Sequence, residues 1–211
     1  MISEAPAHYH HGDLAETLME AALQHIAAEG TESLSLRALA REAGVSATAP
    51  YRHFPSKQCL LAALATRGFK RLRDAMSAGL EPDMGVEDHF RAVGQIYVGY
   101  ALANPTSYNL MFGAVLADFS PYPELQQAAS DCYQVVLDVL EELVAVRGIE
   151  LTASELGGIV WAAVHGIASL LISKTAIPEH GPSNNAQRSL AYVRAHPDKA
   201  LETLFRSLLE P

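Results

Sequence analysis

The strongest constraint on the fold is a pair of short helical patterns joined by a glycine, in the segment LSLRALAREAGVSATAPYRHFPSK at residues 34–57. Ser35 is a typical N-cap for the first helix, and Gly44 is a typical stop. A second short helix is predicted from Ser46. It should have an irregular start, because Pro50 lacks an N–H group and disfavours helical angles in the residue before it. Two short helices around a glycine-containing turn form a helix-turn-helix.

The rest of the chain also follows a helical pattern. Alanine and leucine are abundant and no run alternates strictly between apolar and polar residues, so an all-α fold with little or no sheet is expected. Pro197 is expected to break or kink the last helix. Further helices are predicted at residues 13–29, 56–79, 86–103, 105–113, 122–147, 152–174 and 186–209.

This pattern predicts two parts, an N-terminal three-helix helix-turn-helix domain at residues 1–55 and a C-terminal helical domain at residues 56–211. The N-terminus has no basic flank leading into an apolar block, and no apolar run of about 18 residues stands out, so we expect a cytoplasmic protein without a membrane span. Cys59 and Cys132 stand among apolar residues, which favours buried free thiols over a disulfide.

The charge of the chain is unevenly distributed. The net charge is -9, but residues 1–73 hold 8 basic and 7 acidic side chains, which gives +1. The remaining residues hold 7 basic and 17 acidic side chains, which gives -10. The acidic total therefore does not exclude an N-terminal third that binds a polyanion.

Several motifs resemble those of the TetR family of transcriptional repressors. The match covers residues 10–70 and rests on Ala43-Gly44-Val45, on Tyr51-Arg52-His53-Phe54 and on Lys57. The start YHHGDL at residues 9–14 and the element Trp161-Ala-Ala-Val-His165-Gly166 resemble one branch of that family, with a Trp-x3-His-Gly element in its second domain. The resemblance implies a bacterial homodimer that binds a palindromic double-stranded DNA operator, and whose C-terminal helical bundle binds a small-molecule inducer and dimerises.

The DNA-binding residues are expected around the second short helix. Tyr51 could instead be a packing residue, Lys57 and Arg37 could be ordinary surface charges, and Arg52 could point toward a neighbouring helix. Direct base readers are few, because the predicted helix has no Asn or Gln, so specificity would rest on Arg37, DNA shape and methyl contacts. The predicted DNA-binding set is Arg37, Ser46, Ala47, Thr48, Pro50, Tyr51, Arg52, His53 and Lys57.

The C-terminal part has two further candidate surfaces. Aromatic residues and methionine at helical spacing are more often core than pocket, yet several tyrosines in one bundle suggest an apolar cavity with a few polar points. The predicted pocket, whose assignment follows the resemblance, comprises Tyr97, Tyr100, Tyr108, Met111, Phe112, Trp161 and His165.

A dimer interface is predicted on the two last helices of the chain, where small residues would let a second copy approach closely. The alternative is an ordinary core within one chain. The predicted interface comprises Leu156, Ile159, Ala163, Ile167, Leu170, Leu201, Leu204, Phe205 and Leu208.

Other functions are less well supported by the residues. The cluster His8-Tyr9-His10-His11 could bind a metal, but no carboxylate or cysteine ligand follows at suitable spacing, so an arm that touches DNA or packs on the first helix is favoured, and no metal or cofactor is expected. An enzyme is not expected, because neither a nucleophile with its base nor a glycine-rich phosphate loop is present. The main alternative is a helical protein-interaction module that has lost DNA binding.

Overall fold

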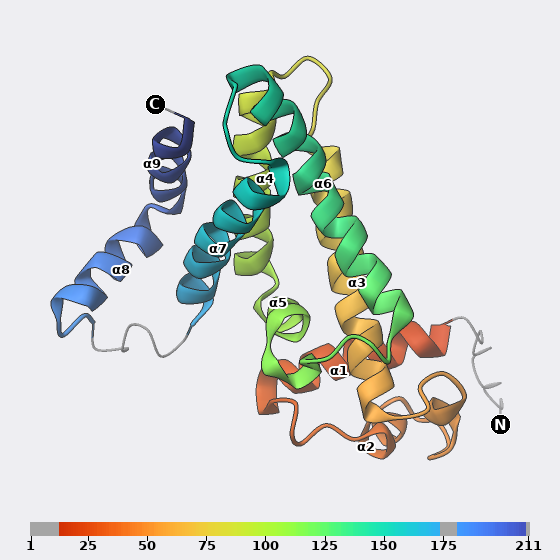
Figure 1. Ribbon diagram of the computed structural model, residues 1–211. Coiled ribbons are helices and arrows are strands. Elements are labelled where there is room, and N and C mark those ends of the chain that lie inside the picture. The colour runs from red at the N-terminus through yellow and green to blue at the C-terminus, as the bar shows by residue number, and fades with distance from the viewer. Residues whose placement is uncertain (1–12, 174–180, 210–211) are drawn as a thin grey trace, which may run out of the picture.

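The structure is a computed structural model that describes residues 13–173 and 181–209, and in these residues the fold is all-α (Figure 1). The His8–His11 cluster lies outside the described residues. The helices are α1 Asp13–Glu29, α2 Leu36–Glu42, η1 Ala49–Arg52, α3 Lys57–Ala78, α4 Val86–Ala103, α5 Pro105–Phe112, η2 Ala114–Leu116, α6 Pro123–Arg147, α7 Ala153–Ile172, α8 Asn185–Ala195 and α9 Pro197–Leu209.

Both ends of α2 have the geometry that the sequence predicts. Ser35 caps the start, since its hydroxyl accepts a hydrogen bond from the Ala38 N–H at 3.1 Å. After the helix, the N–H of Gly44 donates to the Arg41 carbonyl and that of Val45 donates to the Ala40 carbonyl, which is a Schellman motif. Gly44 has a φ of 67°, a left-handed value that favours glycine, so the tight turn depends on this residue.

The second helix of the motif differs from its prediction. No α-helix begins at Ser46, and the chain forms the four-residue 3-10 helix η1 instead. Pro50 stands inside η1 and its ring is buried. The missing N–H of Pro50 and its steric effect on Ala49 both disfavour α-helical hydrogen bonding, and the N–H of His53 donates to the Pro50 carbonyl three residues before it.

Helix α3 belongs to both parts of the molecule. It starts beside the helix-turn-helix and runs up through the bundle next to α6 (Figure 1). Leu60, Leu61 and Leu64 in its first half are fully buried in the core, and Leu72 and Met76 near its other end are equally buried. The predicted range, 56–79, agrees with the observed Lys57–Ala78, and the hydroxyl of Ser56 caps its start.

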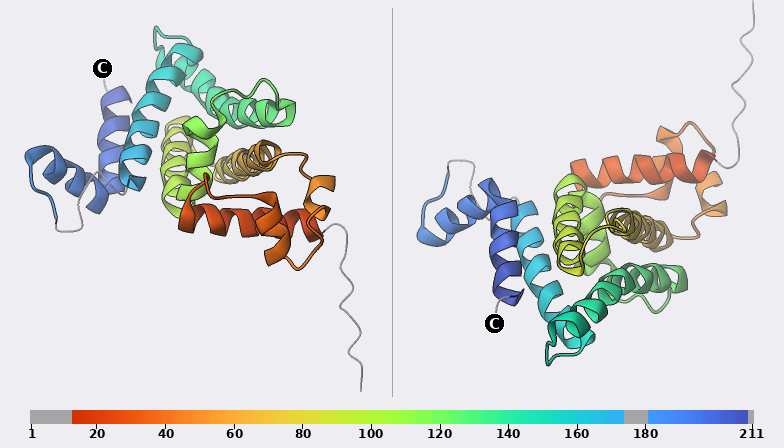
Figure 2. Two further views of the ribbon diagram at one scale, coloured as in Figure 1. Left: turned by 90° about the horizontal axis from the view of Figure 1, so that it is seen from below. Right: turned by 90° about the horizontal axis from the view of Figure 1, so that it is seen from above.

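The bundle is built from α3, α4, α6 and α7, with α8 and α9 on the far side of α7 from α3 and α6 (Figure 2). The predicted break at Pro197 is confirmed, because α8 ends at Ala195 and α9 starts at Pro197. Helix α8 is attached to α7 through Arg194, which donates to the carbonyls of Leu171 and Ser173, both at 3.1 Å. Helix α9 packs on α4, where Phe205 meets Phe90 edge to face.

Helix α7 is more apolar than the sequence reading anticipated. By length and composition it is the one helix in the described ranges that could cross a membrane, with a mean hydropathy of 1.6. It nevertheless packs against α4, α6 and α8, and its first turn is fixed by a capping box between Thr152 and Glu155. A third of its most apolar stretch is buried within the chain, so much of its apolar surface lacks an intrachain partner.

Candidate functional site

Most predicted DNA-binding residues lie on one exposed surface, which the turn after α2 and helix η1 form. Ser46, Ala47, Thr48, Tyr51 and Arg52 are exposed, and the hydroxyls of Ser46 and Thr48 lie 3.3 Å apart. The Tyr51 side chain is 43% exposed, which disagrees with a purely packing role.

Two members of the predicted set lie elsewhere. Pro50 is buried, so its side chain does not take part in the exposed surface and its effect is on the shape of η1. His53 is half-buried beside Phe54, with ring centroids 6.4 Å apart.

The arginines of this surface differ from the paired arginines elsewhere in the described residues. Arg37, Arg41 and Arg52 are exposed, and none of them has a hydrogen bond or ion pair within the described residues. In contrast, Arg67 pairs with Glu16 and Glu20 of α1, at 2.8 and 2.9 Å. Arginines without carboxylate partners remain able to bind phosphate in a bidentate manner.

Arg41 is a candidate that the sequence reading missed. It stands in the last turn of α2, four residues after Arg37, and residues at this spacing lie on the same face of a helix. That spacing is visible in the sequence and could have identified Arg41 as a companion of Arg37.

The start of α3 is a second polar point on the same side. The backbone N–H groups of Lys57 and Gln58 have no partner within the described residues, as is usual in the first turn of a helix, and such groups attract anions. The ammonium group of Lys57 donates to the Glu32 carbonyl at 3.2 Å. That bond holds the charge of Lys57 beside the helix start without neutralising it.

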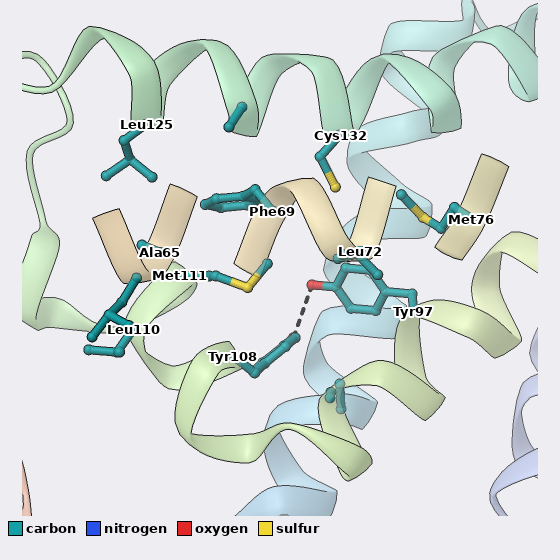
Figure 3. Packing of buried hydrophobic residues seen from close by; sticks show 14 of the residues in the cluster. Ala65, Phe69, Leu72, Met76, Tyr97, Tyr108, Leu110, Met111, Leu125 and Cys132 are labelled. Carbon is teal, nitrogen blue, oxygen red and sulfur yellow. Dashed lines mark hydrogen bonds between the residues drawn. The ribbon is translucent and has the colours of Figure 1, made fainter. Parts of the chain in front are cut away.

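A cavity of about 680 Å³ lies within the bundle, bounded by α3, α4, α6, α7 and the α5–η2 segment. Of the predicted pocket residues, Tyr97, Met111, Phe112 and Trp161 line it. Figure 3 shows several wall residues from α3, α4 and α6 facing one another. The wall residues outside the predicted set include Phe69, Leu72, Met76, Phe90, Phe119, Cys132 and Tyr133.

Tyr108 and His165, which were also predicted for the pocket, do not line the cavity. Both are within hydrogen-bonding distance of the wall residue Tyr97. The Tyr97 hydroxyl is 3.0 Å from that of Tyr108 (Figure 3) and 3.0 Å from His165 Nδ1, and the Tyr108 hydroxyl is 2.7 Å from the same nitrogen. We call Tyr97, Tyr108 and His165 the polar triangle. Burial raises the pKa of both tyrosines and lowers the pKa of His165, so burial favours the uncharged form of all three groups.

Tyr100 is a third predicted pocket residue that does not line the cavity. Its hydroxyl donates to the Gly68 carbonyl of α3 at 3.1 Å, which ties α4 to α3. Gly68 also allows α5 to approach, because a Cβ at this position would lie 2.6 Å from the sulfur of Met111. A wall residue of the cavity therefore presses directly on α3.

The predicted dimer residues divide into two groups. Leu156, Leu201 and Phe205 are buried within the chain, so for these three the prediction is wrong and the alternative, an intrachain core, applies. Leu201 and Phe205 lie on the apolar face of α9, and this face packs against α4.

The other group lies at the surface. Ile159 is 51% and Leu170 is 52% exposed, while Ala163, Ile167, Leu204 and Leu208 are half-buried. Gly158 and Gly166 of α7 would carry a Cβ that meets nothing within 4 Å, so no intrachain contact requires glycine there. We call the surface of Ile159, Ala162, Gly166 and Leu170 the α7 stripe; its members are spaced for one helix face.

The part of the chain that the structure describes holds no group of three or more His, Cys, Asp or Glu side chains able to bind a metal ion. Cys59 and Cys132 are free thiols in this part. Burial raises the pKa of the Cys132 thiol to about 12, so it stays protonated and apolar in the cavity wall.

Known family models match both parts of the chain. The model for bacterial regulatory proteins of the tetR family matches residues 18–64, and that for the tetracyclin repressor-like C-terminal domain matches residues 90–195. The chain belongs to the tetR family. The proposed branch with a Trp-x3-His-Gly element and the domain boundary after residue 55 stay predictions.

Similar proteins agree with this membership. A solved structure of a protein with unknown function from Rhodococcus sp. RHA1 is 31% identical, with a TM-score of 0.74, over 98% of this chain and 100% of that one. A tetR-family regulatory protein from Rhodococcus RHA1 shares the fold, with 21% identity, a TM-score of 0.63 and coverage of 92% and 95%. An HTH-type transcriptional regulator of Mycobacterium tuberculosis is 26% identical over 64% of this chain, and the match spans 59% of that relative's length.

Proposed function

We propose that this tetR-family chain is a one-component DNA-binding transcriptional regulator, and specifically a repressor. It binds a palindromic double-stranded DNA operator as a homodimer, and a small molecule in the bundle cavity releases it. The exposed α2–η1 surface supports DNA binding, because its arginines have no carboxylate partners within the described residues. The side chains that would contact phosphates and base edges are those of Arg37, Arg41, Tyr51, Arg52 and Lys57.

The observation that carries the proposal is the position of α3. Lys57 at its start lies beside the proposed DNA-binding surface, and Phe69, Leu72 and Met76 further along the same helix line the cavity. Lys57 and Phe69 are 12 residues apart, which corresponds to about 18 Å along an α-helix. A ligand that fits the cavity better in one position of α3 therefore favours that position at the DNA-binding surface as well.

The α7 stripe supports the homodimer. A helix-turn-helix protein reads two half-sites about 34–36 Å apart, which requires two copies of the surface. The stripe is apolar, exposed and contains a glycine that leaves room for another backbone, as expected for a self-complementary interface about a two-fold axis.

DNA binding can be tested by fluorescence anisotropy with DNA flanking the protein's own gene, at two salt concentrations and beside random DNA. Specific binding that weakens steeply with salt is expected. Arg52→Ala and Lys57→Ala should each weaken it, whereas Lys199→Ala, which removes an exposed lysine of α9, should not. If no sequence selected from random oligonucleotides binds better than bulk DNA, the protein is a protein-interaction module and the proposal fails.

A further inference from the structure

The cavity wall contains no charged side chain, although its volume is that of a drug-sized ligand site. The described residues that line it are aliphatic, aromatic or small, together with one thiol and the hydroxyls of Tyr97 and Tyr133. A charged ligand would lose its hydration in this cavity without meeting a group of opposite charge, which is strongly unfavourable. The wall thus disfavours charged ligands.

Two arginines on the neighbouring helices are already paired with carboxylates. On α3, Arg73 binds Asp74 at 2.6 Å, with Asp131 of α6 at 3.9 Å. On α4, Arg91 contacts Glu87 and Asp88, and it reaches Glu202 of α9 at 3.4 Å. These arginines bind carboxylates and are not cavity-wall residues, so they do not provide a counter-charge for an anionic ligand.

The polar triangle offers one adjustable hydrogen bond. It has three contacts among two hydroxyls and one imidazole nitrogen, but its two hydroxyl protons can make only two donor bonds at a time when Nδ1 is the acceptor. With the shortest contact made by Tyr108 to His165, the proton of Tyr97 can point either to the Tyr108 oxygen or to an acceptor on a ligand. Tyr97 is also the member of the triangle that lines the cavity.

Aromatic rings alone do not convert this site into a cation site. Phe112 and Trp161 lie 6.3 Å apart and their faces would attract an ammonium group. However, that attraction is smaller than the loss of hydration of a buried charge that has no carboxylate beside it. The same argument, with the opposite sign of charge, excludes fatty acids and other carboxylates.

We propose that the cavity selects an uncharged, mainly apolar ligand with one hydrogen-bonding oxygen, which bonds to the hydroxyl of Tyr97. This inference rests on the proposed function only in taking the cavity as the effector site. It assigns to Tyr97 the role of a specificity-determining residue, with Tyr108 and His165 positioning its hydroxyl.

The test compares three probes with the same ten-carbon chain: 1-decanol, kept below its solubility limit, and decanoate and decyltrimethylammonium, each kept below its critical micelle concentration. Trp161 is the only tryptophan of the chain and lines the cavity, so its fluorescence reports binding directly. Decanol is expected to bind at least about tenfold more tightly than either charged probe. Equal or tighter binding of decanoate or of the ammonium probe would overturn the proposal.

Two variants assign the contact. Tyr97→Phe should weaken decanol binding about threefold to tenfold, as expected for one hydrogen bond. The matched control Tyr100→Phe removes a hydroxyl from the same helix that bonds to Gly68 and not to the cavity, so decanol affinity should stay unchanged. Equal decanol affinities of Tyr97→Phe and wild type would remove Tyr97 from the site.

A parallel DNA-binding titration separates this inference from the proposed function. If decanol binds selectively but does not release bound DNA, the proposal of an uncharged ligand is supported and the proposed control of DNA binding by that ligand is refuted. If DNA binds specifically and the charged probes match decanol in the Trp161 titration, the regulator stands and the ligand class fails.

Discussion

The dimer proposal makes a quantitative prediction for the double variant Ile159→Ser, Leu170→Ser. Full burial of an Ile or Leu side chain stabilises by about 1.5–3 kcal/mol. Both side chains are already about half-buried in the single chain, at 51% and 52% exposure, so the remaining half contributes about 0.75–1.5 kcal/mol each. A symmetric dimer buries four such halves, which gives about 3–6 kcal/mol.

The double variant should therefore raise the dimer dissociation constant by about 10²–10⁴, since each 1.4 kcal/mol corresponds to a factor of ten. Sedimentation velocity over a range of concentrations measures this constant, and circular dichroism checks that the monomer stays folded. The matched control is Val146→Ser, which removes an exposed apolar side chain of α6, 65% exposed, and should leave the constant unchanged. A folded double variant that dimerises within threefold of wild type would refute the α7 stripe as the interface.

Three other substitutions test separate features of the chain. Gly44→Ala forces a φ of 67° on a residue with a Cβ and should lower the free energy of unfolding by about 1 kcal/mol in urea melts; an equally stable protein would show that the turn tolerates a side chain. Gly68→Ala places a Cβ against Met111 and should cost about 1–3 kcal/mol in the same assay, and no loss would mean that α5 can move aside freely. For His165, burial lowers the folded pKa below its ordinary 6.5, so the unfolded chain binds its proton first and stability falls as the pH drops below about 6.5. In thermal melts between pH 7.5 and 5, the wild type should lose more stability than His165→Gln, and equal losses would contradict a buried neutral imidazole.

Local sequence signals predicted most helix ends. Ser35, Ser56 and Gly44 act through hydrogen bonds or backbone angles of their own neighbourhood, so their effect can be read without knowing the fold. Pro50 shows the limit of this reasoning. The expected irregular start proved to be a complete change to a 3-10 helix. The missing N–H of Pro50 and its steric effect on Ala49 leave too few residues for α-helical hydrogen bonds in so short a segment.

The cavity could be predicted only in part. Tyr97 and Trp161, two amphipathic aromatic residues, were predicted as pocket residues. In contrast, Phe69, Leu72 and Met76 of α3 have the spacing of any buried helix face. The spacing of apolar residues shows that one face of a helix is buried, but it does not show whether that face borders a cavity or another helix. The sequence therefore could not distinguish a wall that faces a cavity from one that faces a neighbouring helix.

The same ambiguity explains the error on α9 and points to the α7 stripe as the informative surface. Phe205 and Ile159 both belong to apolar stripes on amphipathic helices, and either could face a second copy. Helix α9 finds its partner within the chain, where the ring of Phe205 packs beside Gly94 and Phe90 of α4. Helix α7 presents one face to α4 and α6 and still leaves Ile159 exposed. An apolar helix that has packed against its intrachain partners and still has an exposed apolar face is stabilised when that face is buried against a second copy. Such a dimer would contain two DNA-binding surfaces and two cavities, one of each in each copy.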